Sequence, residues 1–551
     1  MPDRDAAPQT SGVSPRDDQR LHRSLGTLSL TAITFSSVIG SGWLFAAYKA
    51  SKLAGPAALI SWVVAGLATL LIALVYIDLS FRRPLSGGNV RWPQLASGPL
   101  VGTVIGWAVF LQAAYAGPSE ATAVAQYSGR WLPWLVSGEA LTVPGRLCAA
   151  VLLIVVFALN MIGIGFVARV NNAVTAVKFI VPALTVVLLL ASGFDTKNYA
   201  AGGGFAPNGF AASLTAIVGA GLIYSFTGIN AAAVLSGEAR DPRRTVPRAT
   251  LTALGVSFVI YLGLQLSMLF TLPTGLLGTG WRGINLTSPL AQLASLIGMG
   301  WLSWLLLADA AFSPTGSILI SASVKGRYTY GAAQNGILPR FFAAVHERTG
   351  IPRRALMLNL TIGVVIVLAL GNWSDIASSL SFYYGLSYAA VSVAVTVLYA
   401  VGDRSGGWLG RWSLPVGASS FVLSGLILYW SGWERVRVAA PLLLVGLVVY
   451  AFQGMGRTSR TRLSYRTGAW LIVFLCGLGL MSFLGSFEGR GVITAPYDSL
   501  LVGLASLVIW RAAYRSGLGW HRSASAETGT TASEPVAPAS GSAITAEGPQ
   551  T

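Results

Sequence analysis

The chain has 551 residues, of which 54% are hydrophobic and only 10% are charged, and its mean hydropathy is +0.64. Because soluble domains carry about 25% charged residues, this composition excludes an ordinary water-soluble protein and indicates a polytopic membrane protein. The net charge of +17 suits either nucleic acid or anionic lipid as a partner, and the placement of the charges decides between them.

The first 25 residues are polar and lack the pattern of a signal peptide, so we expect 1–25 to be a cytoplasmic tail. Apolar runs of about 20 residues, each long enough to cross the hydrocarbon core as a helix, then recur along the chain. They predict fourteen membrane helices, over 26–50, 56–80, 99–127, 145–167, 171–192, 212–237, 249–271, 297–323, 355–371, 376–401, 413–432, 438–455, 468–487 and 497–514.

The basic residues are distributed unequally between the two sides of these helices. Of the 37 Lys and Arg, 27 fall on the side of the N-terminus and nine on the other side. This bias predicts that both termini are cytoplasmic. The basic excess therefore points to membrane lipid and not to nucleic acid. The segment 517–551 is rich in small and polar residues and is expected to be a disordered cytoplasmic tail.

Two of the predicted helices contain helix-breaking residues near their middles. The first has Gly40-Ser41-Gly42, and the sixth has Tyr224-Ser-Phe-Thr-Gly228. Glycine in a helix interior costs about 1 kcal/mol relative to alanine. Two interrupted helices, each opening a group of five, indicate an inverted-repeat transporter. The alternative is that the glycines only allow close helix packing.

This interpretation divides the chain into a core and an accessory part. The predicted transporter core covers 26–401, with one five-helix repeat over about 26–192 and the other over about 212–401. Four accessory helices follow over 402–516. The fold class is therefore all-α, with discontinuous helices 1 and 6.

An interrupted helix exposes peptide groups that suit a zwitterion. The half-helix after the first break offers N–H groups of Ser41, Gly42 and Trp43 to a carboxylate. Carbonyl groups near Ile39 and near Tyr224 or Ser225 suit an ammonium group. The predicted substrate-binding residues are Ile39, Gly40, Ser41, Gly42, Trp43, Tyr224, Ser225, Phe226, Thr227 and Gly228.

Three ionisable residues inside predicted helices are candidates for proton coupling, because burying a charge there is costly. Lys178 is in helix 5, and the alternative is that its side chain reaches the interface. Asp309 in helix 8 shares a helix face with Ser313 and Ser317, and the alternative is a structural ion pair. Glu120 in helix 3 is either a proton-path group or an outer vestibule residue.

Several motifs resemble those of the amino acid–polyamine–organocation (APC) permeases. They are Ile39-Gly-Ser-Gly-Trp43, the loop from Gly237 to Arg248, and Asn335-Gly-Ile-Leu-Pro339. The segments Ala54–Trp62, Gly280–Asn285 and Asp309–Pro314 are most similar to the bacterial aspartate:proton symporter branch. The resemblance implies the LeuT-type fold and secondary amino acid transport without nucleotide hydrolysis.

The resemblance also implies roles for single residues. A lysine at the position of Lys178 occupies the region where sodium-coupled relatives bind sodium, which implies proton coupling. Tyr224 matches an aromatic residue that closes over substrate. Many exchangers of this superfamily have glutamate where Asn230 stands, so their coupling mechanism does not transfer to this chain.

The leading hypothesis is a proton-coupled amino acid permease of the plasma membrane that works by alternating access. Acidic substrates are one option because Lys178 is a buried cation, and small neutral amino acids are another. The alternatives are an exchanger of amino acids or polyamines, a receptor-like sensor, and a membrane-embedded transferase. The two cysteines and three histidines show no metal-ligand spacing. We therefore expect neither enzymatic activity nor a cofactor.

Overall fold

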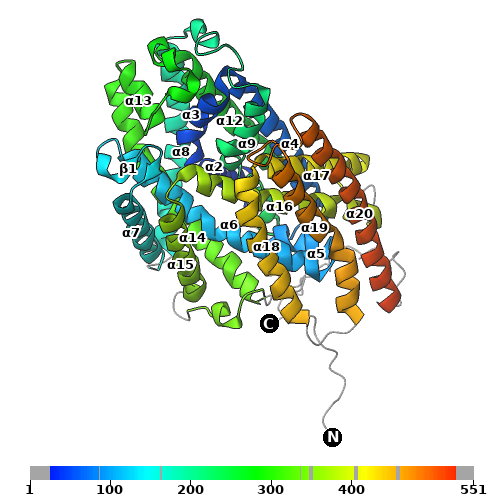
Figure 1. Ribbon diagram of the computed structural model, residues 1–551. Helices are drawn as coiled ribbons and strands as arrows, with labels where there is room; N and C mark the ends of the chain where they lie inside the picture. Colours follow the sequence, from blue (N-terminus) through cyan, green and yellow to red (C-terminus); the bar gives the residue numbers. More distant parts are fainter. Residues whose placement is uncertain are drawn as a thin grey trace, which may run out of the picture.

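The computed structural model describes residues 25–85, 87–161, 164–334, 337–346, 351–402, 407–454 and 459–528 (Figure 1). Within these ranges the chain is nearly all-helical, which confirms the predicted fold class. Two short strands, β1 (Val136–Ser137) and β2 (Ala140–Leu141), pair antiparallel as a hairpin. The tails predicted at 1–24 and beyond 528, and Asn335-Gly336 of the third motif, lie outside the described residues.

Helices occupy all five predicted positions of the first group, and the first of them is interrupted as expected. A short helix, α5, also lies between helices 2 and 3, where no helix is predicted. The bounds are α2 (Thr27–Val38), α3 (Gly42–Ala54), α4 (Ala58–Arg82), α5 (Gly88–Ser97), α6 (Pro99–Ser128), α7 (Val143–Asn160) and α8 (Ile164–Ser192).

The second group also opens with an interrupted helix, but this interruption is longer than predicted. Between 219 and 237 the only α-helical pieces are two of four residues each, so the second half of the predicted helix 6, expected to run to 237, already ends at Val234. The bounds are α9 (Phe210–Gly219), α10 (Leu222–Ser225), α11 (Ala231–Val234), α12 (Pro242–Thr271), α13 (Pro289–Leu296), α14 (Gly300–Gln334), α15 (Arg353–Leu370) and α16 (Trp373–Val401).

Four further helices complete the described chain, at the predicted accessory positions. They are α17 (Ser413–Trp430), α18 (Trp433–Gly454), α19 (Ser459–Leu484) and α20 (Tyr497–Thr528). The expected disorder from 517 onward is wrong as far as Thr528. This part of α20 is wound because it packs against the core: a Cβ on Gly517 would lie 2.5 Å from Val397, and Trp520 lies against Gly98.

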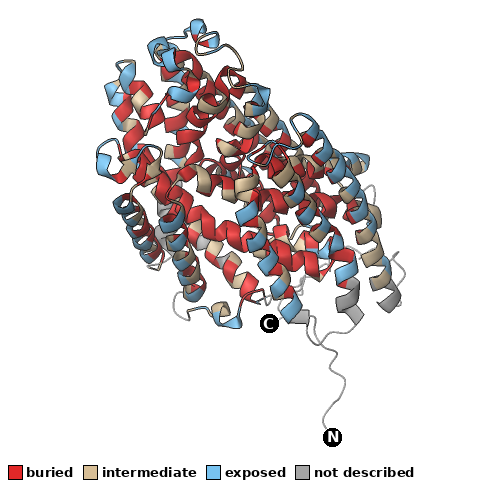
Figure 2. Ribbon diagram, in the orientation of Figure 1, coloured by how far each residue is buried: buried red, intermediate tan, exposed pale blue. Residues whose placement is uncertain are grey.

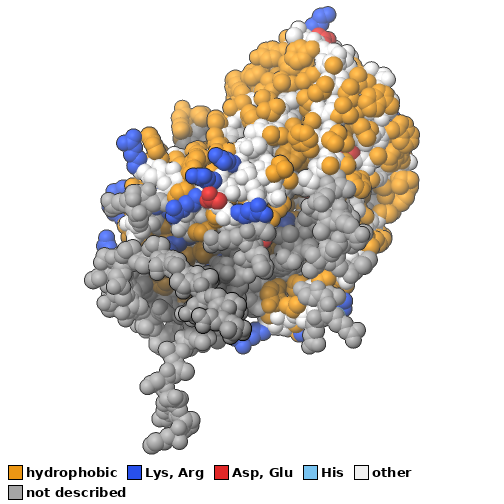
Figure 3. Space-filling view, turned by 180° about the vertical axis from the view of Figure 1, so that it is seen from behind, with side chains coloured by type: hydrophobic (Ala, Val, Ile, Leu, Met, Phe, Trp, Pro, Cys, Tyr) orange, Lys and Arg blue, Asp and Glu red, His pale blue; other side chains and the backbone are white. Residues whose placement is uncertain are grey.

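Eleven described helices are long and apolar enough to cross a membrane. The first and sixth helices are interrupted, and polar residues shorten the apolar stretch of α20. Buried residues fill the centre of the bundle and exposed residues lie at its periphery (Figure 2). Hydrophobic side chains cover the broad upper part of the back of the molecule, and most of the Lys and Arg visible there lie below it (Figure 3). The chain is therefore a multi-pass membrane protein.

The two ends of the bundle carry different elements. The hairpin face carries the β1–β2 hairpin and α13, toward the upper left of Figure 1. The α5 face is the opposite end. Half-helix α3 runs from the middle of the bundle toward the hairpin face, and α2 lies on the other side of the interruption.

Candidate functional site

The interruption of helix 1 is held open by close contacts that only glycine allows. Helix α2 ends at Val38, Ile39 is extended (φ −79°, ψ 90°) and α3 begins at Gly42. A Cβ on Gly40 would lie 2.6 Å from Glu120 Oε1, and a Cβ on Gly42 would lie 2.4 Å from Ser225 Oγ. The two glycines therefore let Glu120 of α6 and Ser225 of α10 approach the unwound backbone.

The start of α3 leaves peptide N–H groups without acceptors. The N–H of Ser41 donates to Glu120 Oε1 at 3.2 Å. The N–H groups of Gly42 and Trp43 have no acceptor among the described residues. These groups carry the positive end of the half-helix dipole, so the first turn of α3 suits a carboxylate. This is the position that the sequence predicts for the substrate carboxylate.

The interruption of helix 6 is organised differently, because its carbonyl groups already accept hydrogen bonds. The hydroxyl of Thr227 donates to the Tyr224 carbonyl at 2.6 Å. The hydroxyl of Tyr261 lies 2.8 Å from the Ser225 carbonyl and 3.2 Å from the Val38 carbonyl. Of the predicted ammonium acceptors, only the Ile39 carbonyl lacks a donor among the described residues.

A buried hydroxyl connects the two interruptions. Tyr224 donates from its hydroxyl to Glu120 Oε1 at 2.7 Å, and the same oxygen lies 3.1 Å from Ser41 Oγ and 3.0 Å from Ser119 Oγ. The indole N–H of Trp373, at the start of α16, donates to Ser41 Oγ at 2.9 Å. We call these five residues the Tyr224 cluster, and all of them are buried.

Three residues that line the two interruptions, Ser119, Trp373 and Tyr261, are not predicted from the sequence. Ser119 directly precedes Glu120 in the chain, but only Glu120 is predicted as a candidate, because it is ionisable. Trp373 is far away in sequence, and its ring also packs where a Cβ on Gly221 would lie, at 2.7 Å. Tyr261 in α12 has no sequence signal beyond its being a polar aromatic in a predicted membrane helix.

Lys178 of α8 places its ammonium group at the end of α2, inside the bundle. Its side chain is buried, and Nζ donates to the Ser36 carbonyl at 2.8 Å. The last carbonyls of a helix carry the negative end of its dipole, which favours a cation there. Glu120 and Asp309 are the acidic groups that attract Lys178. Lys178 therefore interacts electrostatically with each of the other two candidates for proton coupling.

Asp309 is buried without any hydrogen bond. Its side chain is 3% exposed, and neither carboxyl oxygen has a partner among the described residues. Four other buried polar atoms on α3 and α6 are also without partners: Trp43 Nε1, Glu120 Oε2, Thr122 Oγ1 and Gln126 Oε1. A buried carboxylate without hydrogen-bond donors is costly to ionise, and only the attraction of Lys178 opposes that cost at Asp309.

Phe226 packs away from the helix 1 interruption. Its ring lies edge-on to Trp62, at 5.8 Å between centroids, and to Tyr261, at 5.3 Å. Gly228 has a φ of +97°, and a Cβ there would lie 2.5 Å from the Ser37 carbonyl. Both residues therefore shape the interruption, whereas Ser41, Gly42 and Tyr224 face one another across it.

The two sides of the helix 1 interruption differ in exposure. Every residue of α3 from Gly42 to Ser51 is buried, whereas Ser37 of α2 is exposed and Gly40 and Gly228 are half-buried. Half-buried polar residues also follow one face of α14, at Ser317, Ser321, Lys325 and Tyr328. The interruption is thus sealed from the hairpin face and more open toward the α5 face.

Comparisons with known proteins show which family the chain belongs to. The family model "Amino acid permease" matches residues 25–452. The glutamate/serine transporter of Bacillus subtilis is 34% identical over 516 residues, covering 90% of this chain and 94% of that protein. The aspartate-proton symporter of the same organism is 31% identical over 505 residues, covering 90% and 97%.

Among solved structures, a manganese transporter mutant of Eremococcus coleocola covers 84% of this chain at 13% identity with a TM-score of 0.49, and it carries no argument about the site. The family model and the two bacterial relatives each span most of the chain. The protein is therefore a member of the amino acid permease family of the APC superfamily, a transporter and not an enzyme.

Proposed function

We propose that the protein carries an amino acid together with a proton across the plasma membrane, by alternating access and with both termini in the cytoplasm. The observation that carries this proposal is the pair of unbonded N–H groups on Gly42 and Trp43, at a half-helix start buried in the middle of the bundle. A buried donor without an acceptor is costly, and a substrate carboxylate removes that cost. The half-open Gly40 beside it gives a route of entry.

The substrate ammonium group takes the other side of the same interruption. The Ile39 carbonyl lacks a donor, and the negative end of the α2 dipole is close by. The Tyr224 cluster forms one wall, with Glu120 as a fixed acceptor that already receives hydrogen bonds from Ser41 and Tyr224. A small zwitterion is the ligand that satisfies both halves of helix 1.

The proton has a separate carrier in this proposal. Glu120 accepts two hydrogen bonds, which suit an ionised carboxylate, and Lys178 is held on the Ser36 carbonyl as a fixed cation. Asp309 has no donor, so it is the group that gains and loses the proton. Coupling follows when protonated Asp309 and bound substrate both favour the same conformation.

Acidic amino acids are the proposed substrate class. One of the relatives described above is a glutamate/serine transporter and the other is an aspartate-proton symporter. The buried ammonium group of Lys178 supplies positive potential to a second carboxylate. Serine, which also appears in the name of one relative, is the main alternative among neutral substrates.

Uptake into proteoliposomes tests the proposal. With an inward proton gradient, the purified protein is expected to accumulate radiolabelled aspartate or glutamate above equilibrium. Collapsing the gradient with an uncoupler should abolish accumulation. Equal uptake with and without the gradient, together with rapid counterflow, would identify an exchanger instead.

The isosteric variant Asp309→Asn tests the proton carrier. It keeps the shape of the side chain but cannot release a proton. We expect gradient-driven uptake to fall about tenfold or more while substrate binding, measured by isothermal titration, changes less than about threefold. The matched control is Asp195→Asn, because Asp195 is an exposed loop carboxylate. A variant that keeps full gradient-driven uptake would exclude Asp309 as the carrier.

A further inference from the structure

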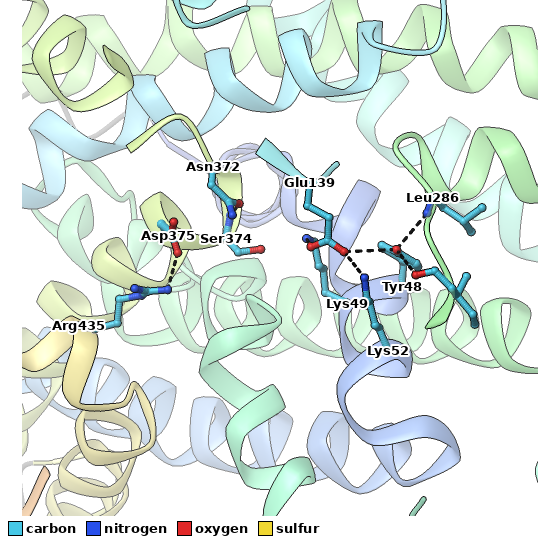
Figure 4. A network of polar contacts seen from close by, with 10 residues as sticks. Tyr48, Lys49, Lys52, Glu139, Leu286, Asn372, Ser374, Asp375 and Arg435 are labelled. Carbon is cyan, nitrogen blue, oxygen red and sulfur yellow. Dashed lines mark hydrogen bonds and ion pairs between the residues drawn. The ribbon is translucent and has the colours of Figure 1, made fainter. Parts of the chain in front are cut away.

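A second polar cluster lies at the far end of the same half-helix, toward the hairpin face (Figure 4). The carboxylate of Glu139, in the turn of the β1–β2 hairpin, binds two lysines of α3. It forms an ion pair with Lys49 and a second with Lys52 at 2.5 Å. The side chain of Lys49 is only 7% exposed, so this lysine has little access to water in place of Glu139.

The electrostatics of the cluster keep Glu139 charged. Burial alone would raise the pKa of its carboxyl group, but the neighbouring ammonium groups of Lys49 and Lys52 outweigh burial and hold that pKa below its usual range. Other charges lie nearby: Asp375 attracts Lys49 but is itself paired with Arg435. Glu139 is thus the carboxylate that neutralises the outer end of α3.

The hairpin that carries Glu139 is fixed to a different part of the bundle. The N–H of Leu141 donates to the Gly371 carbonyl at 2.8 Å, in the connection between α15 and α16. Arg146 of α7 donates to the Leu368 carbonyl at 2.9 Å and to the Leu141 carbonyl at 3.3 Å. Glu139 therefore joins α3 to the frame made by α7, α15 and α16.

A second contact holds the same end of α3. The hydroxyl of Tyr48 donates to the Ile284 carbonyl at 2.9 Å and accepts from the N–H of Leu286 at 3.0 Å. Half-helix α3 is thus tied at its outer end to two loops of the hairpin face. Its inner end carries the N–H groups of Gly42 and Trp43, so a movement of this one rod would change both ends together.

We propose that Glu139 is the latch of the outer gate: its ion pairs with Lys49 and Lys52 hold α3 closed against the hairpin, and they break when the site opens toward the hairpin face. This inference rests on the alternating-access transport proposed above. The sealed α3 and the partly exposed Gly40 correspond to the latched state. On opening, water replaces Glu139 around the two lysines. Glu139 is a positioning residue, because it acts on the substrate through α3.

The experiment measures access to α3 from outside the cell. Ala46, one turn inward of Lys49, is replaced by cysteine in a background with Cys148→Ser and Cys476→Ser, because both native cysteines are exposed. A membrane-impermeant maleimide is added to intact cells. We expect Glu139→Gln to increase the labelling rate about tenfold or more. Asp195→Asn, on the same side of the membrane, should leave the rate unchanged.

A double-mutant cycle distinguishes a latch from a general loosening of the fold. Lys49→Met should also speed labelling, and the double variant should be no faster than the quicker single variant, because both remove one interaction. In transport, Glu139→Gln should lower the KM for external substrate at least threefold and lower kcat more strongly, because closing becomes harder. If Glu139→Gln does not fold, Lys52→Gln, at the more exposed pair, should give a smaller increase of about threefold.

A labelling rate within twofold of the parent for Glu139→Gln and Lys52→Gln would overturn the latch. So would fully multiplicative effects of Glu139→Gln and Lys49→Met. The labelling needs no substrate, so a parent protein that transports no amino acid would refute the proposed function and leave this result readable.

Discussion

The two interruptions in the membrane helices use the same residue types but differ in what they leave unbonded. At helix 1, the N–H groups of Gly42 and Trp43 and the Ile39 carbonyl have no partner among the described residues. At helix 6, Thr227 and Tyr261 already occupy the carbonyls of Tyr224 and Ser225. A broken helix is therefore a binding site only where the surrounding side chains leave its peptide groups free. We expect helix 1 to hold the ligand and helix 6 to shape the wall.

The largest effect is expected for Gly42→Ala. The added Cβ would lie 2.4 Å from Ser225 Oγ and 3.1 Å from Ser225 Cα, so the two interruptions must move apart. Misplacing binding groups by about 1 Å costs about a hundredfold, and we expect that loss in kcat/KM for uptake. The control is Gly255→Ala in α12, where the added Cβ meets nothing within 4 Å. Near-normal uptake by Gly42→Ala would contradict a ligand at helix 1.

Lys178→Met should give a smaller and more selective effect. Methionine keeps an apolar stem but removes the donor to the Ser36 carbonyl. Leaving that buried carbonyl unpaired costs about 1–3 kcal/mol of stability. Without the fixed cation beside Glu120 and Asp309, we expect accumulation against a gradient to fall about tenfold, whereas counterflow stays within about threefold. Equal loss of both activities would show that Lys178 supports substrate binding and not coupling.

The smallest effect is expected at helix 6. Thr227→Val removes only the hydroxyl that donates to the Tyr224 carbonyl. We expect a loss of about 1 kcal/mol in stability, measured by thermal unfolding in detergent, because one hydrogen bond is lost. The KM for uptake should change by less than about threefold. A tenfold fall in KM would mean that the freed Tyr224 carbonyl binds substrate, and a tenfold rise would mean that the Thr227 hydroxyl does. Either result would remove the contrast between the two interruptions.

Much of the fold could be predicted from the sequence because the bilayer imposes simple rules. Apolar runs locate the spanning helices, and Gly40, Gly42 and Gly228 mark interruptions that no lipid-facing helix tolerates. The length of the helix 6 interruption was not predictable: Ala231–Val234 is helical in composition and in structure, but the helix ends at Val234 and does not continue to 237. The same holds for the end of α20, whose winding depends on Gly98 and Val397, far away in the chain.

The site was only partly predictable, for a related reason. A local pattern indicates which peptide groups a break exposes, and so Ser41, Gly42 and Trp43 could be named. It does not indicate which distant side chains form hydrogen bonds with the residues of the break. Trp373 of α16 forms a hydrogen bond with Ser41, and Tyr261 of α12 forms one with Ser225. Both hydrogen bonds arise only from tertiary packing. The Glu139 ion pairs are hidden for the same reason, since Glu139 belongs to a loop without a motif.

The Tyr261 hydroxyl has one proton and two carbonyls within reach, one at each interruption. It can donate fully to only one of them at a time. If helices 1 and 6 shift relative to each other during the transport cycle, the Tyr261 hydroxyl will donate to either the Val38 carbonyl or the Ser225 carbonyl, depending on the conformation. A fluorinated tyrosine at this position would therefore have two distinct NMR signals. The ratio of their intensities would give the relative populations of the two conformations, without any added label near the substrate.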